Sequence, residues 1–218
     1  MNTKNTGEDA TVNNSHIVFP PAAQRAQAER GSAGAYAGKV ANGFPDRITP
    51  DLAAFIAERD TAFLATVSED GAPYIQHRGG PKGFIKVIDD KTLGFADYAG
   101  NRQYIRLGNL AGNDRAYLFL IDFATRQRIK LWGRARLIEG DTALIEKLFD
   151  KGYRARPQRV ILFTVEAGDI NCSQHITPRF TQDEVAGATE VLQQRMAKLE
   201  AENAELRAKL AQQDPEAD

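Results

Sequence analysis

The sequence has a single cysteine, Cys172, which excludes an intrachain disulfide framework and a multi-cysteine zinc or iron–sulfur site. It has no apolar run long enough to span a membrane, and its first residues, MNTKNTGEDATVNN, lack the apolar core of a signal peptide. Charge of one sign is not in excess either. The formal net charge is -1, so no general attraction to nucleic acid or to anionic lipid is expected. These absences predict a cytoplasmic protein that uses local binding sites, with no bound metal, nucleic acid or membrane.

A length of 218 residues allows one sizeable core and an appended element. Residues 1–30 are polar and carry two consecutive prolines, which predicts a partly mobile arm or a strap lying on another surface. Residues 31–180 then form the globular domain, residues 181–213 a separate helix, and residues 214–218 a tail. Within the domain, Thr49 and Pro50 predict the start of a short helix that ends near Arg59.

The globular domain is rich in strand-like sequence. TAFLATVSEDGAPYIQHR predicts a hairpin with a turn at Asp70-Gly71, and residues 83–87 and 92–95 predict a second hairpin. RAYLFLIDF and RIKLWGRARLI follow as two more strands, with a bulge or bend at Gly133. A helix over 142–151 and a last strand over 159–166 complete the domain. The pattern predicts a mainly β (α+β) fold, an antiparallel β-barrel with short flanking helices.

Two basic clusters flank these strands and suggest a phosphate site. Arg78 precedes Gly79 and Gly80, so a guanidinium lies beside backbone that a ligand can approach closely. Asn101 and Arg102 are expected at the N-terminus of a short helix over RQYIRLGNL that Gly108-Asn109 caps, where the helix dipole favours an anion. The alternatives are structural: Arg78 as a surface or dimer salt bridge, and Arg102 as a helix-start residue paired with Asp97.

The last helix carries a heptad repeat. Val185, Leu192, Leu199 and Leu206 occupy position d, and Thr189, Met196, Asn203 and Leu210 occupy position a. Leucine at d with one asparagine at a is typical of a parallel two-stranded coiled coil. The alternative is a single amphipathic helix that folds back on the barrel. The preceding segment, ITPRFTQDEV, is not basic enough for a DNA-binding zipper.

The runs PYIQHRGGPKGFIKVID, TLGFADYAGNRQY, RIKLWGRARLI and NCSQHITPRF resemble the pyridoxamine-5'-phosphate-oxidase-like FMN-binding proteins. The resemblance covers residues 31–180, and its most specific pieces are QHRGGP and GNR. That family has a split β-barrel fold and forms homodimers that hold FMN in clefts at the subunit interface, so the resemblance implies the same here. In the oxidase itself a segment with arginine and tryptophan recognises the vitamin substrate. Here NCSQHITPRF and the heptad helix take its place, so oxidation of pyridoxine phosphate is not expected.

The resemblance also implies the site residues. Arg78 and Arg102 would bind the FMN phosphate, and Arg128 would reach the cofactor from the second subunit. His77 could hydrogen-bond the flavin or transfer a proton, and the alternative is a structural imidazole. For Cys172, a packing role is favoured over a role as nucleophile. For Trp132, a place in the core is favoured over a role as a stacking platform. The full set of expected cofactor-binding residues is Gln76, His77, Arg78, Gly79, Phe95, Asp97, Tyr98, Asn101, Arg102, Arg128, Gln174 and His175.

The sequence thus predicts a homodimeric flavoprotein, an oxidoreductase that passes electrons through FMN from a small-molecule or nicotinamide donor. No side chain is assigned a catalytic role. A second hypothesis is a flavin-binding carrier, sensor or scaffold without turnover. A third keeps the barrel but replaces FMN with haem or a deazaflavin.

Overall fold

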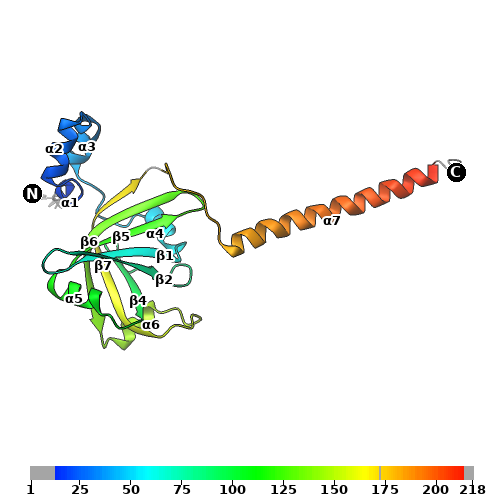
Figure 1. The fold of residues 1–218 in the computed structure, drawn as a ribbon. Coiled ribbons are helices and arrows are strands. Elements are labelled where there is room, and N and C mark those ends of the chain that lie inside the picture. Colours follow the sequence, from blue (N-terminus) through cyan, green and yellow to red (C-terminus); the bar gives the residue numbers. More distant parts are fainter. Residues whose placement is uncertain (1–12, 172, 214–218) are drawn as a thin grey trace, which may run out of the picture. The chain divides into compact units, whose positions relative to one another are not determined.

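A computed structural model describes residues 13–171 and 173–213. Seven antiparallel strands form one curved sheet in the order β2-β1-β5-β6-β7-β4-β3 (Figure 1). This confirms the mainly β, split-barrel fold. The strands are β1 (Thr61–Val67), β2 (Pro73–Gly79), β3 (Lys86–Val87), β4 (Thr92–Tyr98), β5 (Arg115–Asp122), β6 (Gln127–Glu139) and β7 (Pro157–Asn171).

The chain forms two compact units. The first runs up to Asp122 and resumes over Arg126–Gln174, and it contains the sheet. The second consists of Phe123–Thr125 and His175–Asp218, and it contains the long helix α7. The helices are α1 (Ser15–Val18), α2 (Pro21–Glu29), α3 (Ala33–Asn42), α4 (Pro50–Ala57), α5 (Ile105–Gly112), α6 (Thr142–Leu148) and α7 (Gln182–Gln213).

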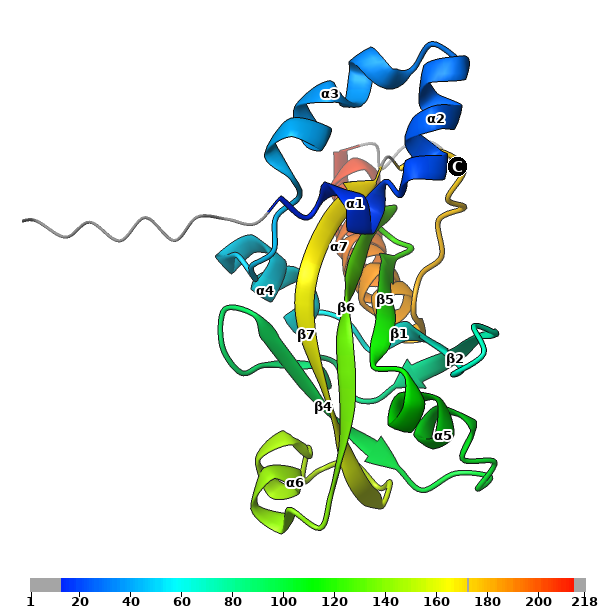
Figure 2. The ribbon, with the colours of Figure 1, turned by 90° about the vertical axis from the view of Figure 1, so that its left-hand side faces the viewer.

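The first three helices lie at one end of the sheet, and α5 and α6 lie toward the other end (Figure 2). In the arm expected over residues 1–30, α1 and α2 occupy most of the described part, and the tip lies outside the described residues. The side chain of Asn14 donates to the carbonyls of Phe44 (2.9 Å) and Glu166 (2.7 Å), and it accepts from the Phe44 amide. Phe19 adds edge-to-face contacts with Tyr36 and Phe44, so this segment is fixed to the sheet.

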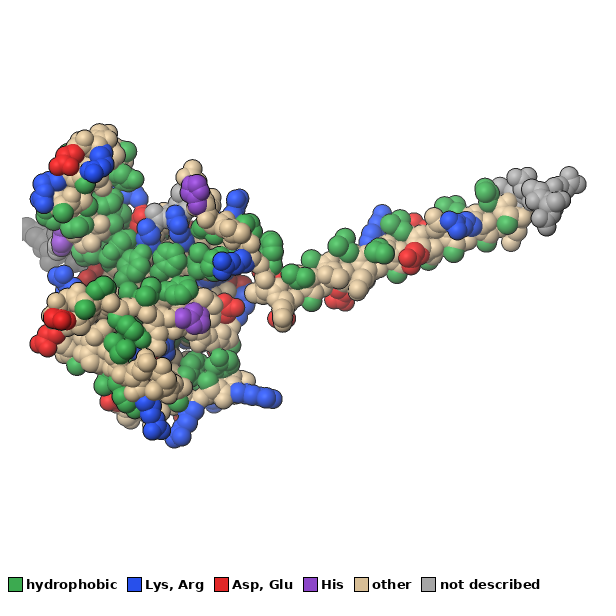
Figure 3. Space-filling model, in the orientation of Figure 1, with side chains coloured by type: hydrophobic (Ala, Val, Ile, Leu, Met, Phe, Trp, Pro, Cys, Tyr) green, Lys and Arg blue, Asp and Glu red, His purple; other side chains and the backbone are tan. Residues whose placement is uncertain are grey.

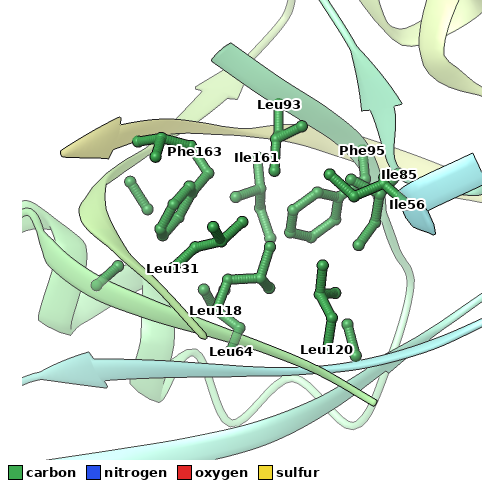
Figure 4. Packing of buried hydrophobic residues seen from close by; sticks show 14 of the residues in the cluster. Ile56, Leu64, Ile85, Leu93, Phe95, Leu118, Leu120, Leu131, Ile161 and Phe163 are labelled. Carbon is green, nitrogen blue, oxygen red and sulfur yellow. The ribbon is translucent and has the colours of Figure 1, made fainter. Parts of the chain in front are cut away.

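The core follows from strand alternation. In β1 the residues Ala62, Leu64 and Thr66 point inward and are buried, and their neighbours are half-buried on the other face. In β4 five consecutive residues are buried, because this strand is covered on both faces. Figure 4 shows the buried side chains from several strands and α4 converging on one cluster, among them Ile56, Leu64, Ile85, Leu93, Phe95, Leu118, Leu120, Leu131, Ile161 and Phe163.

Several local predictions are confirmed. The hydroxyl of Thr49 accepts from the Leu52 amide and caps α4. The β1–β2 hairpin turns at Asp70-Gly71, where Gly71 has a φ of 93°. The pairing of β6 with β7 shifts register between Trp132 and Gly133, as expected for a bulge. A Cβ at Gly133 would lie 2.0 Å from the Thr164 carbonyl oxygen, so this close approach requires glycine.

Other boundaries were wrong. The strand expected over 83–87 is reduced to Lys86–Val87, and the last strand is longer than expected, over Pro157–Asn171. Gly108-Asn109 does not end α5, which continues to Gly112. The reason is that Asn109 is buried and its amide donates to the Thr66 hydroxyl of β1 (3.0 Å), which holds this turn of the helix on the sheet. Among the described residues, no helix is long and apolar enough to cross a membrane.

Candidate functional site

The predicted basic clusters meet at a cavity of about 380 Å³. Strand β2, the end of β4, the loop over 99–104 and helix α5 form its walls. The side chains that line it include four arginines and one carboxylate. The lining residues are Tyr74, Gln76, His77, Arg78, Gly79, Asp97, Tyr98, Ala99, Gly100, Asn101, Arg102, Gln103, Tyr104, Ile105, Arg106, Leu107, Gln158 and Arg159.

Strand β2 presents its polar residues to the cavity through simple alternation. Gln76 and Arg78 lie on the same face, Gln76 partly buried and the Arg78 side chain largely buried. The imidazole of His77, which is exposed, packs edge-to-face on Phe63 of β1, with ring centroids 5.7 Å apart. His77 therefore lies where the cavity meets the outer face of the sheet.

Asp97 is the centre of the charge network. It is 3% exposed, and its carboxylate accepts from Arg78 Nη2 at 2.7 Å and from Arg106 Nη2. A third guanidinium belongs to Arg159, whose Nη1 lies 3.9 Å from Asp97 Oδ2. Its Nε pairs with Glu139 Oε1 at 2.9 Å. Gln76 Oε1 accepts from Arg106 (2.7 Å) and from Arg78 (3.0 Å), which fixes both guanidinium groups. One buried carboxylate thus holds several cations at the cavity wall.

The cations are crowded. Burial and the neighbouring Arg106 lower the pKa of Arg78, and Asp97 acts in the opposite direction. Arg106 also has a buried Nε without a hydrogen-bond partner among the described residues. The lining contributes more positive than negative charge, so an anion in the cavity would reduce the repulsion between the guanidinium groups.

The loop after β4 has a strained backbone. Arg102 and Tyr104 adopt φ values of 60° and 53°, a region that residues other than glycine rarely occupy. Such strain is concentrated at functional sites, where surrounding structure maintains it. The Arg159 guanidinium lies 5.4 Å from the centre of the Tyr104 ring, which stabilises one end of the loop. Asn101 accepts from the Gln103 amide at 3.3 Å.

The prediction that Asn101 and Arg102 begin a helix was wrong, because α5 starts at Ile105 and Tyr104 is its N-cap. Both residues nevertheless line the cavity and are exposed there. The alternative role of Arg102 as the partner of Asp97 was also wrong: within the described residues, Arg78, Arg106 and Arg159 make those contacts. Arg102 is therefore an exposed cation at the cavity.

The two glycines after Arg78 have different surroundings. Gly79 lines the cavity, and Gly80 does not. The Gly80 amide donates to the Asp60 carbonyl at 3.1 Å, and a Cβ at Gly80 would lie 2.6 Å from Phe84 Cβ. Close packing against Phe84 therefore explains why position 80 is a glycine. The presence of this glycine does not require a phosphate at its backbone.

Tyr98 also lines the cavity, and its ring packs on those of Phe149 and Tyr153 with centroids 6.2 Å and 5.3 Å away. Burial, together with Tyr153 and Asp150, raises its pKa, so the hydroxyl stays protonated. A neutral hydroxyl can donate one hydrogen bond and accept others. Tyr98 therefore adds a polar group beside the arginines.

Four expected cofactor residues lie outside this cavity. Phe95 was misplaced: it is fully buried in the core against Phe84, because β4 is covered on both faces at this point. Arg128 lies on β6 and has a buried Nε without a hydrogen-bond partner among the described residues. Gln174 and His175 are exposed and do not line the cavity. The interpretation of Cys172 as a packing residue falls outside the described residues.

Sequence reasoning missed Arg106 and Arg159. Arg106 lies in the first turn of α5, just after the N-cap Tyr104, so the placement of the helix start is what could have indicated it. Arg159 lies opposite Asp97 in the β4–β7 pairing. That cross-strand charge pair joins distant parts of the chain, and the sequence alone does not reveal the pairing.

Comparison with known protein families decides the relationship. Residues 48–172, more than half of the chain, match the family model described as pyridoxamine 5'-phosphate oxidase. The chain belongs to this family. The match contains every strand of the sheet and all four of the cavity arginines. No curated protein sequence matches.

Solved structures with a similar fold are distant in sequence. HupZ of Group A Streptococcus is 18% identical with a TM-score of 0.47, covering 61% of this chain and 99% of its own. An FMN-binding protein from Syntrophomonas wolfei subsp. wolfei is 12% identical with a TM-score of 0.45, covering 55% and 83%. A protein named F420 reductase is 21% identical with a TM-score of 0.40, covering 56% and 98%.

Proposed function

We propose that this member of the family is a cytoplasmic FMN-binding flavoprotein, an oxidoreductase whose cavity holds the FMN phosphate. The observation that carries the proposal is the set of guanidinium groups around Asp97. Arg78 and Arg106 are largely buried and already oriented by Asp97 and Gln76, so a phosphate would meet fixed donors. Arg102, exposed on the strained loop, would close over the ligand.

The residues at the cavity fit a phosphate better than a neutral ligand. Four arginines against one carboxylate leave a surplus of positive charge that a dianion can neutralise. Bound FMN would supply the redox chemistry through its isoalloxazine ring. The side chains of this chain would bind and orient the cofactor, with Asn101 and Tyr98 as further polar contacts.

We propose a homodimer in which the outer face of the sheet is the subunit interface. Phe63, Tyr117, Phe119 and Trp132 are half-buried on this face, and Ile75 beside them is 63% exposed. Figure 3 shows hydrophobic side chains gathered across this part of the sheet. His77 packs on Phe63 and also lines the cavity, so a second subunit on this face would border the ligand. By its alternation in β6, Arg128 lies on the same face, as its expected role across the interface requires.

The spectrum of the purified protein tests the cofactor first. We expect flavin absorbance from FMN, in the native preparation or after addition of FMN. A Soret band would instead indicate haem, and a deazaflavin spectrum would indicate that cofactor. Colourless protein that does not respond to FMN would contradict the proposal.

Titration of FMN into variants tests the phosphate assignment. Arg78→Ala and Arg106→Ala should each weaken binding by about 1.5 to 3 kcal/mol, roughly 10- to 150-fold in Kd, because each removes a charge-assisted contact. Arg78→Lys should recover only part of the affinity, since lysine lacks the fork. Arg136→Ala is the matched control, because Arg136 is exposed on β6 and does not line the cavity. Native affinity in both alanine variants would refute the assignment.

Reduction of bound FMN by NADH or NADPH distinguishes the enzyme from a carrier, sensor or scaffold. An oxidoreductase with a nicotinamide donor should show bleaching of the flavin band and reoxidation by an acceptor. Bound FMN that neither nicotinamide nor another small-molecule donor reduces would favour the non-catalytic alternative.

A further inference from the structure

Helix α7 carries an apolar stripe that the other described residues of its own unit leave uncovered. The helix is continuous over Gln182–Gln213, and every residue from 182 to 212 is exposed. Leu192, Leu206 and Leu210 are 65%, 65% and 68% exposed. Figure 3 shows hydrophobic side chains recurring along this helix. A helix of this kind is stabilised when an apolar partner covers the stripe.

The stripe has coiled-coil geometry. Val185, Leu192, Leu199 and Leu206 recur every seven residues, and Met196 and Leu210 lie on the same side at the intervening positions. This narrow seam suits knobs-into-holes packing with one similar helix. Ion pairs within the helix, Lys198 with Glu202 and Lys209 with Glu205, lie beside the seam and support the helical conformation.

We propose that α7 binds the α7 of a second copy of this chain as a parallel, in-register coiled coil. Charge complementarity supports a second copy. Arg195 at position g would face Glu200 at position e of the second copy, and Glu202 would face Arg207. The proposal is independent of the cofactor, because it rests on residues of α7 alone.

Asn203 determines whether the two α7 helices run parallel or antiparallel. In a parallel pair Asn203 at position a meets Asn203 of the second copy, and the two amides can hydrogen-bond. In an antiparallel pair with full overlap, Asn203 would face Leu192, and its amide would be buried without a partner. The charges alone do not decide, because Arg195 would then face Glu202. The buried asparagine therefore favours the parallel arrangement.

Cysteine cross-linking of the full chain tests the proposal. In a Cys172→Ser background, Met196→Cys places a thiol at position a, and Gln194→Cys places one at the outward position f. A disulfide requires Cα atoms within about 7 Å, which position a of a parallel pair provides and position f does not. In a glutathione redox buffer, the effective thiol concentration at position a is on the order of millimolar, so at micromolar protein we expect at least a tenfold excess of cross-linked dimer for Met196→Cys.

Each outcome has a defined meaning. A strong excess at position 196 over position 194 supports the parallel coiled coil. Equal, slow cross-linking of the two variants would overturn the self-association. Preferential cross-linking in a mixture of Met196→Cys and Leu199→Cys chains, without cross-linking of Met196→Cys to itself, would overturn the parallel direction in favour of the antiparallel one. The circular dichroism of each variant, matched to native, verifies that α7 remains helical.

Discussion

The sheet and α7 place the same residue types in opposite environments. Leu64, Leu118 and Leu131 of the sheet are at most 1% exposed, and Leu192 and Leu206 of α7 are each 65% exposed. The leucines of the sheet are buried within one chain, and this burial stabilises the fold. The exposed leucines of α7 contribute no such stabilisation until another surface covers them. The sheet unit therefore completes its own core, and the stripe of α7 is the surface that the proposed coiled coil would cover.

Charged residues differ between the two regions in the same way. At the cavity, the Arg78–Asp97 pair is 11% and 5% exposed, and its members have further buried partners. On α7, the Lys198–Glu202 pair is 65% and 52% exposed. Buried pairs are costly to break because one partner remains as an uncompensated charge, and exposed pairs contribute little. Substitutions at the cavity should therefore cost far more stability than substitutions on α7.

Asp97→Asn should lower the free energy of unfolding of the sheet by about 3 to 5 kcal/mol, because Arg78 and Arg106 lose their buried counter-charge. Urea denaturation followed by Trp132 fluorescence measures this loss. Inorganic phosphate should recover part of it, since an anion in the cavity can neutralise the guanidinium groups.

The matched control is Asp114→Asn, which removes a carboxylate from a pair with Arg134 in which both side chains are 50% exposed. We expect a change of at most about 1 kcal/mol. Equal, small losses in the two variants would show that the Asp97 network contributes no more than a surface ion pair.

Gly133→Ala should destabilise the sheet by about 1 to 3 kcal/mol, because the new methyl group would overlap the Thr164 carbonyl at the bulge. Gly187→Ala on α7 is the control from the other region, since a Cβ there has no atom within 4 Å. It should stabilise the helix by about 0.5 to 1 kcal/mol. Thermal unfolding by Trp132 fluorescence and by circular dichroism measures the two effects, and native stability of Gly133→Ala would show that the bulge can open.

Features that depend on local sequence could be predicted. Asp70-Gly71 between two alternating runs encodes a hairpin, Thr49-Pro50 encodes a helix start, and Gly133 inside a strand encodes a bulge. Each needs only a few neighbouring residues. The basic clusters also indicated Arg78 and Arg102 as phosphate ligands, the family resemblance assigned that phosphate to FMN, and the structure brings both residues to one cavity.

Features that depend on distant pairing could not be predicted. The contact of Arg159 with Asp97 requires the register of β4 on β7, and the anchor from Asn14 to Glu166 joins residues 152 positions apart. Phe95 was placed at the cofactor because the family resemblance of FADYAGNR implied it, yet both faces of β4 are covered there. Burial on two faces is a tertiary property that strand alternation does not encode.

The smallest effect concerns the edges of the proposed coiled coil. Arg195→Glu should weaken the association by a few tenths of a kcal/mol for each of the two symmetric contacts, because it opposes Glu200 of the second copy. Adding Glu200→Arg should restore it in a parallel pair, where the exchanged charges attract again. In an antiparallel pair Glu200 would face Gln193, and the second change would restore nothing. Helix melting at low salt measures these differences. At about 1 M salt they should vanish, because the screening length falls to about 3 Å.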